Sequence, residues 1–296
     1  MLNDVICGNC LNLFESGSLA RGFDLTFLDP PFNQGKQYVH HNDEMSEDKY
    51  WNMMKDVCKN IFAHTDKGGA IYFMQREKNA EFVLDTLRET GWSFQNLIIW
   101  KKKSSAVPVS GKFGKHYQVI AYATKGAKAG TFHRLRIDPE LPASYKHKRE
   151  NGMYVTDVWD DIRELTSGYF AGDEAIRRKD GERFHKQQAP IALLLRIILS
   201  SSKVGDTIFD PFAGTGTTLA VAKQLQREFI GIEIDRKNVN CARGRLSNLR
   251  KADSIGAFYK DYIHTQNLDE IWGTQDGGYE YEPVKTISQA RMFEAS

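Results

Sequence analysis

The chain has 296 residues, enough to bury one substantial hydrophobic core with or without an inserted segment. Its 41% hydrophobic and 26% charged residues are ordinary for a soluble globular protein, and no apolar run approaches the roughly 20 residues that span a bilayer. The first residues lack the basic start and apolar stretch of a secretory signal, so we expect a cytoplasmic protein. The net charge of +2 gives only weak support for a polyanionic partner.

Apolar runs and amphipathic segments alternate along the first part of the chain. Strands are predicted at residues 25–28, 70–73, 94–100 and 118–123, and helices at 47–62 and 79–89. The strand candidates are short, rich in β-branched and aromatic residues and without polar alternation, which is typical of strands covered on both faces.

The alternation stops between about residues 125 and 184, where the sequence becomes polar and basic without a long apolar period. We interpret this segment as an insertion. Its cations and aromatic residues include His133, Arg134, Arg136, Tyr145, Lys146, His147, Lys148, Arg149, Tyr154, Trp159, Tyr169, Phe170, Arg177, Arg178, Lys179 and Arg183. This mixture indicates a nucleic-acid face, although a solvated surface explains the charge alone equally well.

The alternation resumes after residue 185. Helices are predicted at residues 190–199, 217–225 and 235–249, and strands at 207–209 and 229–232. The residues after about 252 are aromatic but weakly periodic, so we expect them to pack against the core or a partner. Strand–helix alternation of this density predicts the α/β class, with a doubly wound, mostly parallel sheet that binds ligands outside the carboxyl ends of its strands.

A glycine-containing turn follows the strand that ends at Asp210. Gly214 and Gly216 let the backbone bend sharply and approach a ligand. The turn fits neither phosphate-binding template, because it lacks Gly-Lys-Ser/Thr and has Leu219 in place of the last glycine of a dinucleotide fingerprint. Glu233, at the end of the next strand, can accept hydrogen bonds from two ribose hydroxyls. Together these features predict a nucleoside ligand held without a phosphate cradle, and S-adenosylmethionine meets that description.

A second strand-end loop reads Asp29-Pro30-Pro31-Phe32. The two prolines stiffen the turn and remove two N–H groups. The Asp29 carboxylate and the Pro30 carbonyl then form a fork of two acceptors, which matches an NH₂ group with two hydrogens to donate. Phe32 could stack on a planar base. The alternative is a proline-rich turn with an exposed aspartate and a buried phenylalanine.

In this order, the two loops resemble the β-class amino-methyltransferases of DNA, in which the catalytic loop precedes the cofactor loop. The resemblance extends to about Leu249 and implies a Rossmann-like methyltransferase fold that uses S-adenosylmethionine. It divides the chain into a catalytic half (1–124), a target-recognition insertion (125–184), a cofactor-binding half (185–251) and a C-terminal extension (252–296).

The resemblance also implies the substrate, double-stranded DNA, with adenine N6 as the methylated atom. Members that act on cytosine N4 usually begin the catalytic loop with Ser, whereas this chain has Asp29. N4-cytosine methylation stays open as the alternative, and a non-catalytic DNA-binding module is less favoured. A flipped-out base would receive the methyl group by direct displacement. A homodimer and a cognate restriction endonuclease are further partners that the resemblance suggests.

Site residues follow from the resemblance, position by position. The catalytic residues would be Asp29, Pro30, Pro31 and Phe32, and the cofactor-binding residues Asn9, Gln188, Asp210, Pro211, Phe212, Ala213, Gly214, Thr215, Gly216, Thr217, Thr218, Glu233 and Asp235. The chain departs from the class where Phe32 replaces a common Tyr, Asn9 a common Asp and Ala189 a Lys. We interpret His185 as structural, and Cys7 and Cys10 as lacking the partners of a metal site.

Overall fold

The computed structural model describes residues 2–17, 19, 22–33, 45–104, 108, 110–138, 150–165, 172–178, 180–184 and 187–273. Its strands are β1 (Asp4–Cys7), β2 (Phe23–Leu28), β3 (Thr65–Arg76), β4 (Ser93–Lys101), β5 (Tyr117–Thr124), β6 (Arg136–Ile137), β7 (Met153–Tyr154), β8 (Val158–Trp159), β9 (Thr207–Asp210) and β10 (Glu228–Glu233). Its α-helices are α1 (Cys10–Glu15), α2 (Glu47–His64), α3 (Ala80–Glu89), α4 (Ile191–Ser201), α5 (Thr217–Gln224), α6 (Arg236–Ser247) and α7 (Leu268–Trp272). Short 3-10 helices cover Glu77–Asn79 (η1), Lys251–Asp253 (η3) and Gly256–Tyr262 (η4).

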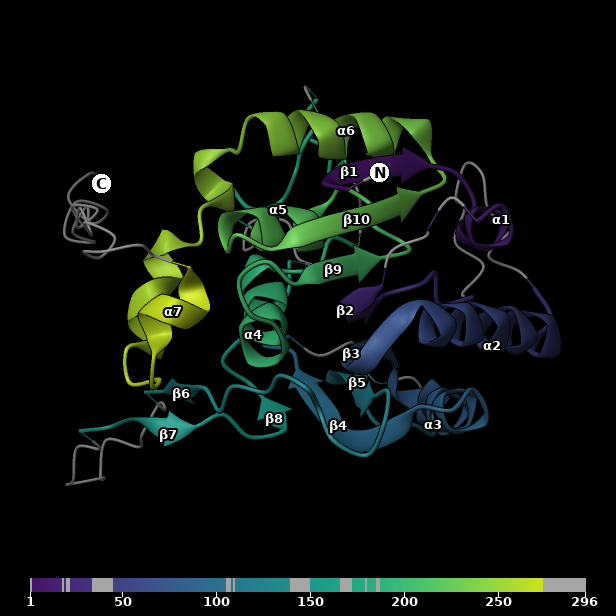
Figure 1. Ribbon diagram of the computed structural model, residues 1–296, viewed down its shortest axis with the longest axis horizontal. Coiled ribbons are helices and arrows are strands. Elements are labelled where there is room, and N and C mark those ends of the chain that lie inside the picture. Colours follow the sequence, from purple (N-terminus) through teal and green to yellow (C-terminus); the bar gives the residue numbers. More distant parts are fainter. Residues whose placement is uncertain are drawn as a thin grey trace.

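The main sheet has eight strands in the described part of the chain, in the order β1-β10-β9-β2-β3-β5-β4-β8 (Figure 1). Neighbouring strands from β1 to β3 in this order pair in parallel. β5 runs antiparallel to both β3 and β4, and β8 is parallel to β4. The sheet is therefore mostly parallel, as predicted, and β5 runs against the rest.

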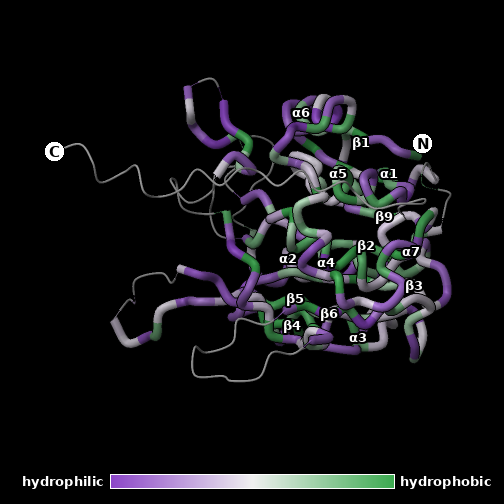
Figure 2. Tube along the Cα trace, turned by 90° about the vertical axis from the view of Figure 1, so that its left-hand side faces the viewer, coloured by the Kyte–Doolittle hydropathy of each residue, from purple (hydrophilic) through white to green (hydrophobic). Residues whose placement is uncertain are grey.

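Helices cover both faces of this sheet. Alternate residues of a strand point to opposite faces, so one strand contributes side chains to both helix layers. Tyr72 and Met74 of β3 belong to the core formed with α4, α5 and α6. Ile71 and Phe73 of the same strand belong to the core formed with α1, α2 and α3. The hydrophobic segments gather between these layers in Figure 2. The prediction of a doubly wound α/β sheet is confirmed.

Every predicted strand and helix is present, and β3, at 12 residues, is much longer than the predicted 70–73. The short elements β1, α1, β6, β7, β8 and α7 were not predicted. β1 is a four-residue edge strand whose first residue is Asp4, so it carries little apolar signal. The six-residue α1 is too short for a clear period and is fixed by Asn9, whose side chain accepts a hydrogen bond from the Leu11 N–H.

The predicted insertion starts at the amino ends of the parallel strands. Gly130 N–H donates to the Gly68 carbonyl at 2.8 Å, beside the start of β3, and His133 N–H donates to the Ser200 carbonyl at 2.7 Å, at the end of α4. The chain then returns through β8 toward the carboxyl ends. Of the cations and aromatic residues named above, Tyr145, Lys146, His147, Lys148, Arg149, Tyr169, Phe170 and Lys179 lie outside the described residues.

The described C-terminal segment packs onto the face formed by α4 to α6. Ile255, Tyr262, Leu268 and Trp272 are buried members of that core. The prediction that this part of the chain packs against the core is thus confirmed as far as residue 273. Among the described helices, none is long and apolar enough to cross a membrane.

Candidate active site

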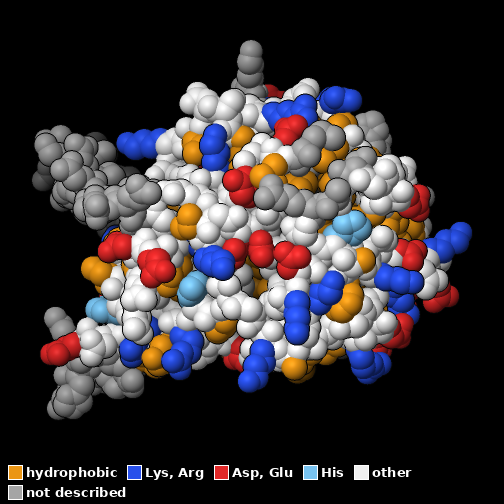
Figure 3. Space-filling view, viewed as in Figure 1, with side chains coloured by type: hydrophobic (Ala, Val, Ile, Leu, Met, Phe, Trp, Pro, Cys, Tyr) orange, Lys and Arg blue, Asp and Glu red, His pale blue; other side chains and the backbone are white. Residues whose placement is uncertain are grey.

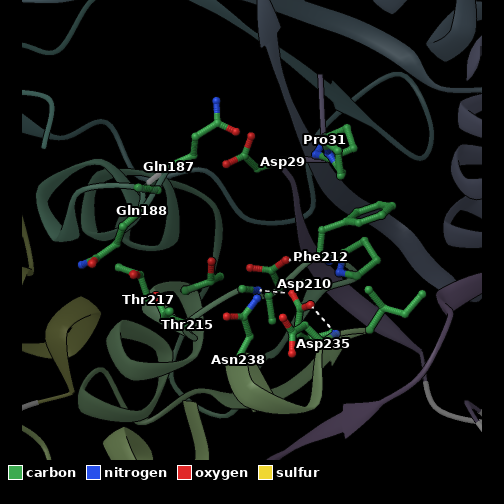
Figure 4. A pocket seen from close by; sticks show the side chains of 18 of the residues that line it. Asp29, Pro31, Gln187, Gln188, Asp210, Phe212, Thr215, Thr217, Asp235 and Asn238 are labelled. Atoms are coloured by element: carbon green, nitrogen blue, oxygen red, sulfur yellow. Dashed lines mark hydrogen bonds between the residues drawn. The ribbon is translucent and has the colours of Figure 1, made fainter. Parts of the chain in front are cut away.

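A cavity of about 910 Å³ opens at the carboxyl ends of β1, β10, β9 and β2. Its walls include the loop after β2, residues 29–32, and the loop after β9, residues 210–218, which we call the Asp29 loop and the Asp210 loop. They lie side by side because β2 and β9 pair in parallel, with Thr26 opposite Phe209. The volume falls within the roughly 300 to 1,000 Å³ of small-molecule sites. Figure 4 shows Asp29 and Pro31 at one end of the view and Asp235 and Asn238 at the other.

Asp210 is buried and held by its own loop. Its Oδ1 accepts the Phe212 N–H at 3.1 Å, and the Thr218 side chain makes a second hydrogen bond to the carboxyl. Burial is the main reason that the pKa of Asp210 rises to about 7, and the nearby charge of Glu233 adds to it. Asp210 therefore holds its own loop in place through these two hydrogen bonds.

Both glycines of the Asp210 loop adopt the left-handed conformation that favours this residue. Gly214 has φ +51° and Gly216 has φ +77°. A Cβ at Gly214 would meet nothing within 4 Å, whereas a Cβ at Gly216 would lie 2.9 Å from the Cβ of Ala242. Gly214 is therefore needed for the turn alone, and Gly216 also lets α6 pack against the start of α5.

Glu233 ends β10 and faces the same cavity. Its Oε2 accepts the Gly214 N–H at 2.9 Å and its Oε1 the Asp235 N–H at 2.7 Å, and the Asn238 side chain makes a further hydrogen bond. A carboxylate has about four acceptor positions, so one remains for a ligand hydroxyl beside these bonds. Burial raises the pKa of Glu233, which a hydrogen-bonding ligand would counteract.

Asp29 differs from these two acids in having no hydrogen-bond donor among the residues that the structure describes. No hydrogen bond reaches its carboxyl from any residue in the described part of the chain. Burial raises its pKa well above the usual range, the charge of Asp210 raises it further, and Lys102 opposes the shift. Pro30 and Pro31 line the cavity beside it. Asp29 is an acceptor placed at the cavity without a donor of its own.

Most residues predicted for the site line this one cavity: Asn9, Asp29, Pro30, Pro31, Gln188, Asp210, Pro211, Phe212, Ala213, Gly214, Thr215, Thr217, Thr218, Glu233 and Asp235. Gly216 and Phe32 do not line it. Phe32 is only 6% exposed and packs in the core with Phe27 and Tyr72. An aromatic ring next to a strand end gains more from burial in the core than from exposure at a cavity. The stacking role of Phe32 stays a prediction, and it requires the ring to leave the core.

Two of the predicted cofactor contacts already have partners within the chain. The Oδ1 of Asn9 caps α1 through the Leu11 N–H at 2.9 Å. Gln188 accepts the Ile176 N–H at 3.0 Å and donates to the Glu174 carbonyl at 3.1 Å. Gln188 therefore ties the insertion to the start of α4 as well as lining the cavity. His185 lies outside the described residues.

The sequence did not reveal several residues that shape the site. Gln187, Asn238 and Arg183 line the cavity. Arg245 is buried behind it, where its Nη1 donates to the Thr215 carbonyl at 3.2 Å and to the Thr217 hydroxyl at 3.0 Å. Its Nη2 pairs with Asp253 at 2.8 Å, so the C-terminal segment supports the Asp210 loop. The sequence feature that could have indicated this support is the arginine in the last turn of α6.

Comparison with known proteins identifies the family. A family model described as DNA methylase matches residues 23–243, most of the chain. The chain belongs to the DNA methylase family. This methylase is 32% identical over 244 residues to the DNA adenine methyltransferase YhdJ of Escherichia coli (strain K12), and the match covers 77% of each chain. It is 29% identical over 255 residues to the type II methyltransferase M.HpaI of Haemophilus parainfluenzae, covering 85% of this chain and 76% of the relative.

Solved structures agree with the fold of this methylase. The M1.HpyAVI–SAM complex superposes with a TM-score of 0.57 at 20% identity, over 83% of this chain and 99% of that one. The likeness is one of fold.

Proposed function

We propose that this methylase transfers a methyl group from S-adenosylmethionine to N6 of adenine in double-stranded DNA. One observation carries the assignment: the Asp29 carboxyl, which accepts no hydrogen bond from the described residues, shares a cavity with a nucleoside-type site built on Gly214 and Glu233. The named activity of the relative YhdJ supports adenine, and so does the aspartate that opens the loop. N4 of cytosine remains the second candidate for the same geometry, because it also offers an NH₂ group.

The residues present fit the cofactor. The cavity has the volume of a nucleoside site, a Cβ at Gly214 would meet no other atom, and Glu233 retains one acceptor position for a ribose hydroxyl. The Asp210 loop, Glu233 and Asp235 would hold the nucleoside part. When bound, S-adenosylmethionine supplies an electrophilic methyl group on a sulfonium.

The remaining chemistry belongs to the Asp29 loop. The Asp29 carboxylate and the Pro30 carbonyl accept the two hydrogens of the base amine, which turns the nitrogen lone pair out of conjugation with the ring. Asp29 also stabilises the positive charge that grows on this nitrogen. Fixing the amine in this direction supplies much of the lowering of the barrier. The adenine must first leave the helix, at a cost of a few kcal/mol.

The DNA would approach the carboxyl ends of the strands, where the cavity opens. Lys101 ends β4 at this edge and Lys102 and Lys103 follow it, while Arg178 lines the cavity. The face seen in Figure 3 carries Lys and Arg side chains interspersed with Asp and Glu, so it is not a uniformly basic surface. We infer that a specific duplex sequence is read near the cavity. The pairing of two copies, a cognate endonuclease and a cytoplasmic location stay predictions.

Methyl transfer should be measured with cofactor radiolabelled on the methyl group, using duplex DNA, RNA and a protein mixture as acceptors. We expect label in duplex DNA alone, and N6-methyladenine after digestion to nucleosides. Recovery of N4-methylcytosine would move the assignment to the second candidate, and label in RNA or protein would overturn the DNA substrate.

A further inference from the structure

A short hairpin from the insertion closes one side of the cavity. Arg177 and Arg183 form its β-bridge, and the Phe184 N–H donates to the Ile176 carbonyl at 2.7 Å. Gln188 fastens the strand before the turn to the start of α4. The side chains that the hairpin presents to the cavity are Arg178, Glu182, Arg183 and Phe184.

Arg183 is the unusual member of this wall. Its Nε and Nη2 are shielded from solvent and have no hydrogen-bond partner among the residues that the structure describes. None of the ion pairs in the described part of the chain includes it. Burial lowers the pKa of Arg183, and the like charge of Arg177 lowers it further. Buried N–H donors that have no acceptor raise the free energy of the folded protein. A guanidinium in this position therefore favours an anion supplied by a bound ligand.

The position of Arg183 within the cavity indicates which anion this is. Glu233, Asp235 and Asn238 mark the nucleoside end, on β10 and the start of α6. Gln187 and Gln188, which connect the hairpin to α4, lie on another side of the cavity from Asp235 and Asn238 (Figure 4). In S-adenosylmethionine the amino-acid part extends from the sulfonium away from the nucleoside, and it ends in a carboxylate.

We propose that the Arg183 guanidinium binds the carboxylate of the amino-acid part of S-adenosylmethionine. The inference rests on the proposed function and adds to it the residue that recognises the far end of the cofactor. Guanidinium and carboxylate form two parallel charge-assisted hydrogen bonds, which satisfies the buried donors. The acids of the cavity, Asp29 and Asp210 among them, suit the sulfonium and ammonium of the same molecule.

The test compares S-adenosylmethionine with its decarboxylated form, which keeps the sulfonium and the amine and lacks only the carboxylate. Binding of each to the full chain is measured by calorimetry without DNA. We expect Arg183→Ala to weaken S-adenosylmethionine by about ten- to a hundredfold and the decarboxylated form by less than about twofold. Arg183→Lys, which keeps the charge but not the fork, should recover part of the loss.

The matched control is Arg177→Ala, which removes the same charge from the same hairpin. Arg177 donates to the Gly181 carbonyl and does not line the cavity, so the preference for the carboxylated cofactor should persist. Equal losses for both nucleosides in Arg183→Ala, or the same loss of preference in Arg177→Ala, would overturn the proposal.

Unchanged cofactor affinity in Arg183→Ala with weaker binding of duplex DNA would assign the guanidinium to a phosphate instead, and would also overturn the proposal. A wild-type chain that binds neither nucleoside would overturn the proposed function itself. These two results differ, so the inference and the function on which it rests can fail separately.

Discussion

The loops after β2 and β9 both begin with Asp-Pro and differ at the third residue, which is Pro31 in one and Phe212 in the other. The Phe212 N–H donates to the Asp210 carboxyl two residues before it. Proline has no N–H, so Pro31 cannot do the same for Asp29. The same pair of residues thus yields an aspartate that its own loop hydrogen-bonds in one case, and in the other an aspartate that we propose binds the substrate.

This difference shows how an acceptor is kept free inside a protein. A buried carboxyl is normally met by nearby backbone N–H groups, and such bonds would compete with a substrate amine. In the Asp29 loop the consecutive prolines remove those donors and also restrict the backbone. Burial is the main cause of the raised pKa of Asp29, and the neighbouring charge of Asp210 raises it further.

The largest effect should come from removing the free carboxylate. Asp29→Asn is expected to lower kcat by at least about a hundredfold, because the charge that stabilises the reacting nitrogen is lost. Cofactor affinity, measured by calorimetry, should stay within a few-fold of the wild type. Near-normal turnover in this variant would remove Asp29 from the chemistry.

Pro31→Ala gives the Asp29 loop a backbone N–H at the position where the Asp210 loop has the Phe212 N–H. The new N–H can bond the carboxylate, which lowers the pKa of Asp29 and competes with the substrate amine. We expect kcat to fall about tenfold and the acid limb of the pH–rate profile to move to lower pH. Cofactor affinity serves as the control and should not change. A slower enzyme with an unshifted profile would point to a change in loop shape alone.

The Asp210 loop should make cofactor binding depend on pH. With a pKa of about 7 in the free protein, Asp210 holds a proton below neutrality, and that proton must leave when a sulfonium is placed nearby. Affinity should therefore rise with pH and level off above pH 7, with a difference of up to about tenfold between pH 6 and pH 8. Asp210→Asn cannot titrate and should flatten this dependence. Persistence of the slope in that variant would assign it to another acid of the cavity.

The smallest expected effect concerns the stability of the free protein. The pKa of Asp210 is raised from 3.8 to about 7 in the folded state, so folding loses stability as the pH rises through that interval. Asp210→Asn removes this loss and should raise the Tm at pH 8 by roughly 2–6 °C, with a smaller gain at pH 5. Scanning calorimetry of both proteins without cofactor measures it. A gain in Tm that is larger at pH 5 than at pH 8 would contradict the predicted direction of the pH dependence.

The sequence predicted the sheet and both loops because their signals are local. Apolar runs mark the central strands, and Asp-Pro at a strand end marks each loop. The sequence left open whether Phe32 stacks on a base or is buried, because the direction of a side chain after two prolines depends on which core surface is within reach; the structure shows it buried. The contacts of Gln188 with residues 174–176, and the support of the Asp210 loop by Arg245, depend on pairings across the fold that no local pattern encodes.

The described insertion is attached to the sheet and helices by hydrogen bonds at separate points, and by Leu135, Trp159 and Ile162, which are buried in the main core. Gly130 and His133 dock on the amino ends of the strands, Glu164 accepts the Lys103 N–H beside β4, and Gln188 closes the stretch at α4. Residues between such anchors can be exchanged, inserted or deleted without repacking the interior. We therefore expect the choice of DNA sequence, which we assign to the insertion, to diverge while the two Asp-Pro loops and the reaction proposed for them remain the same.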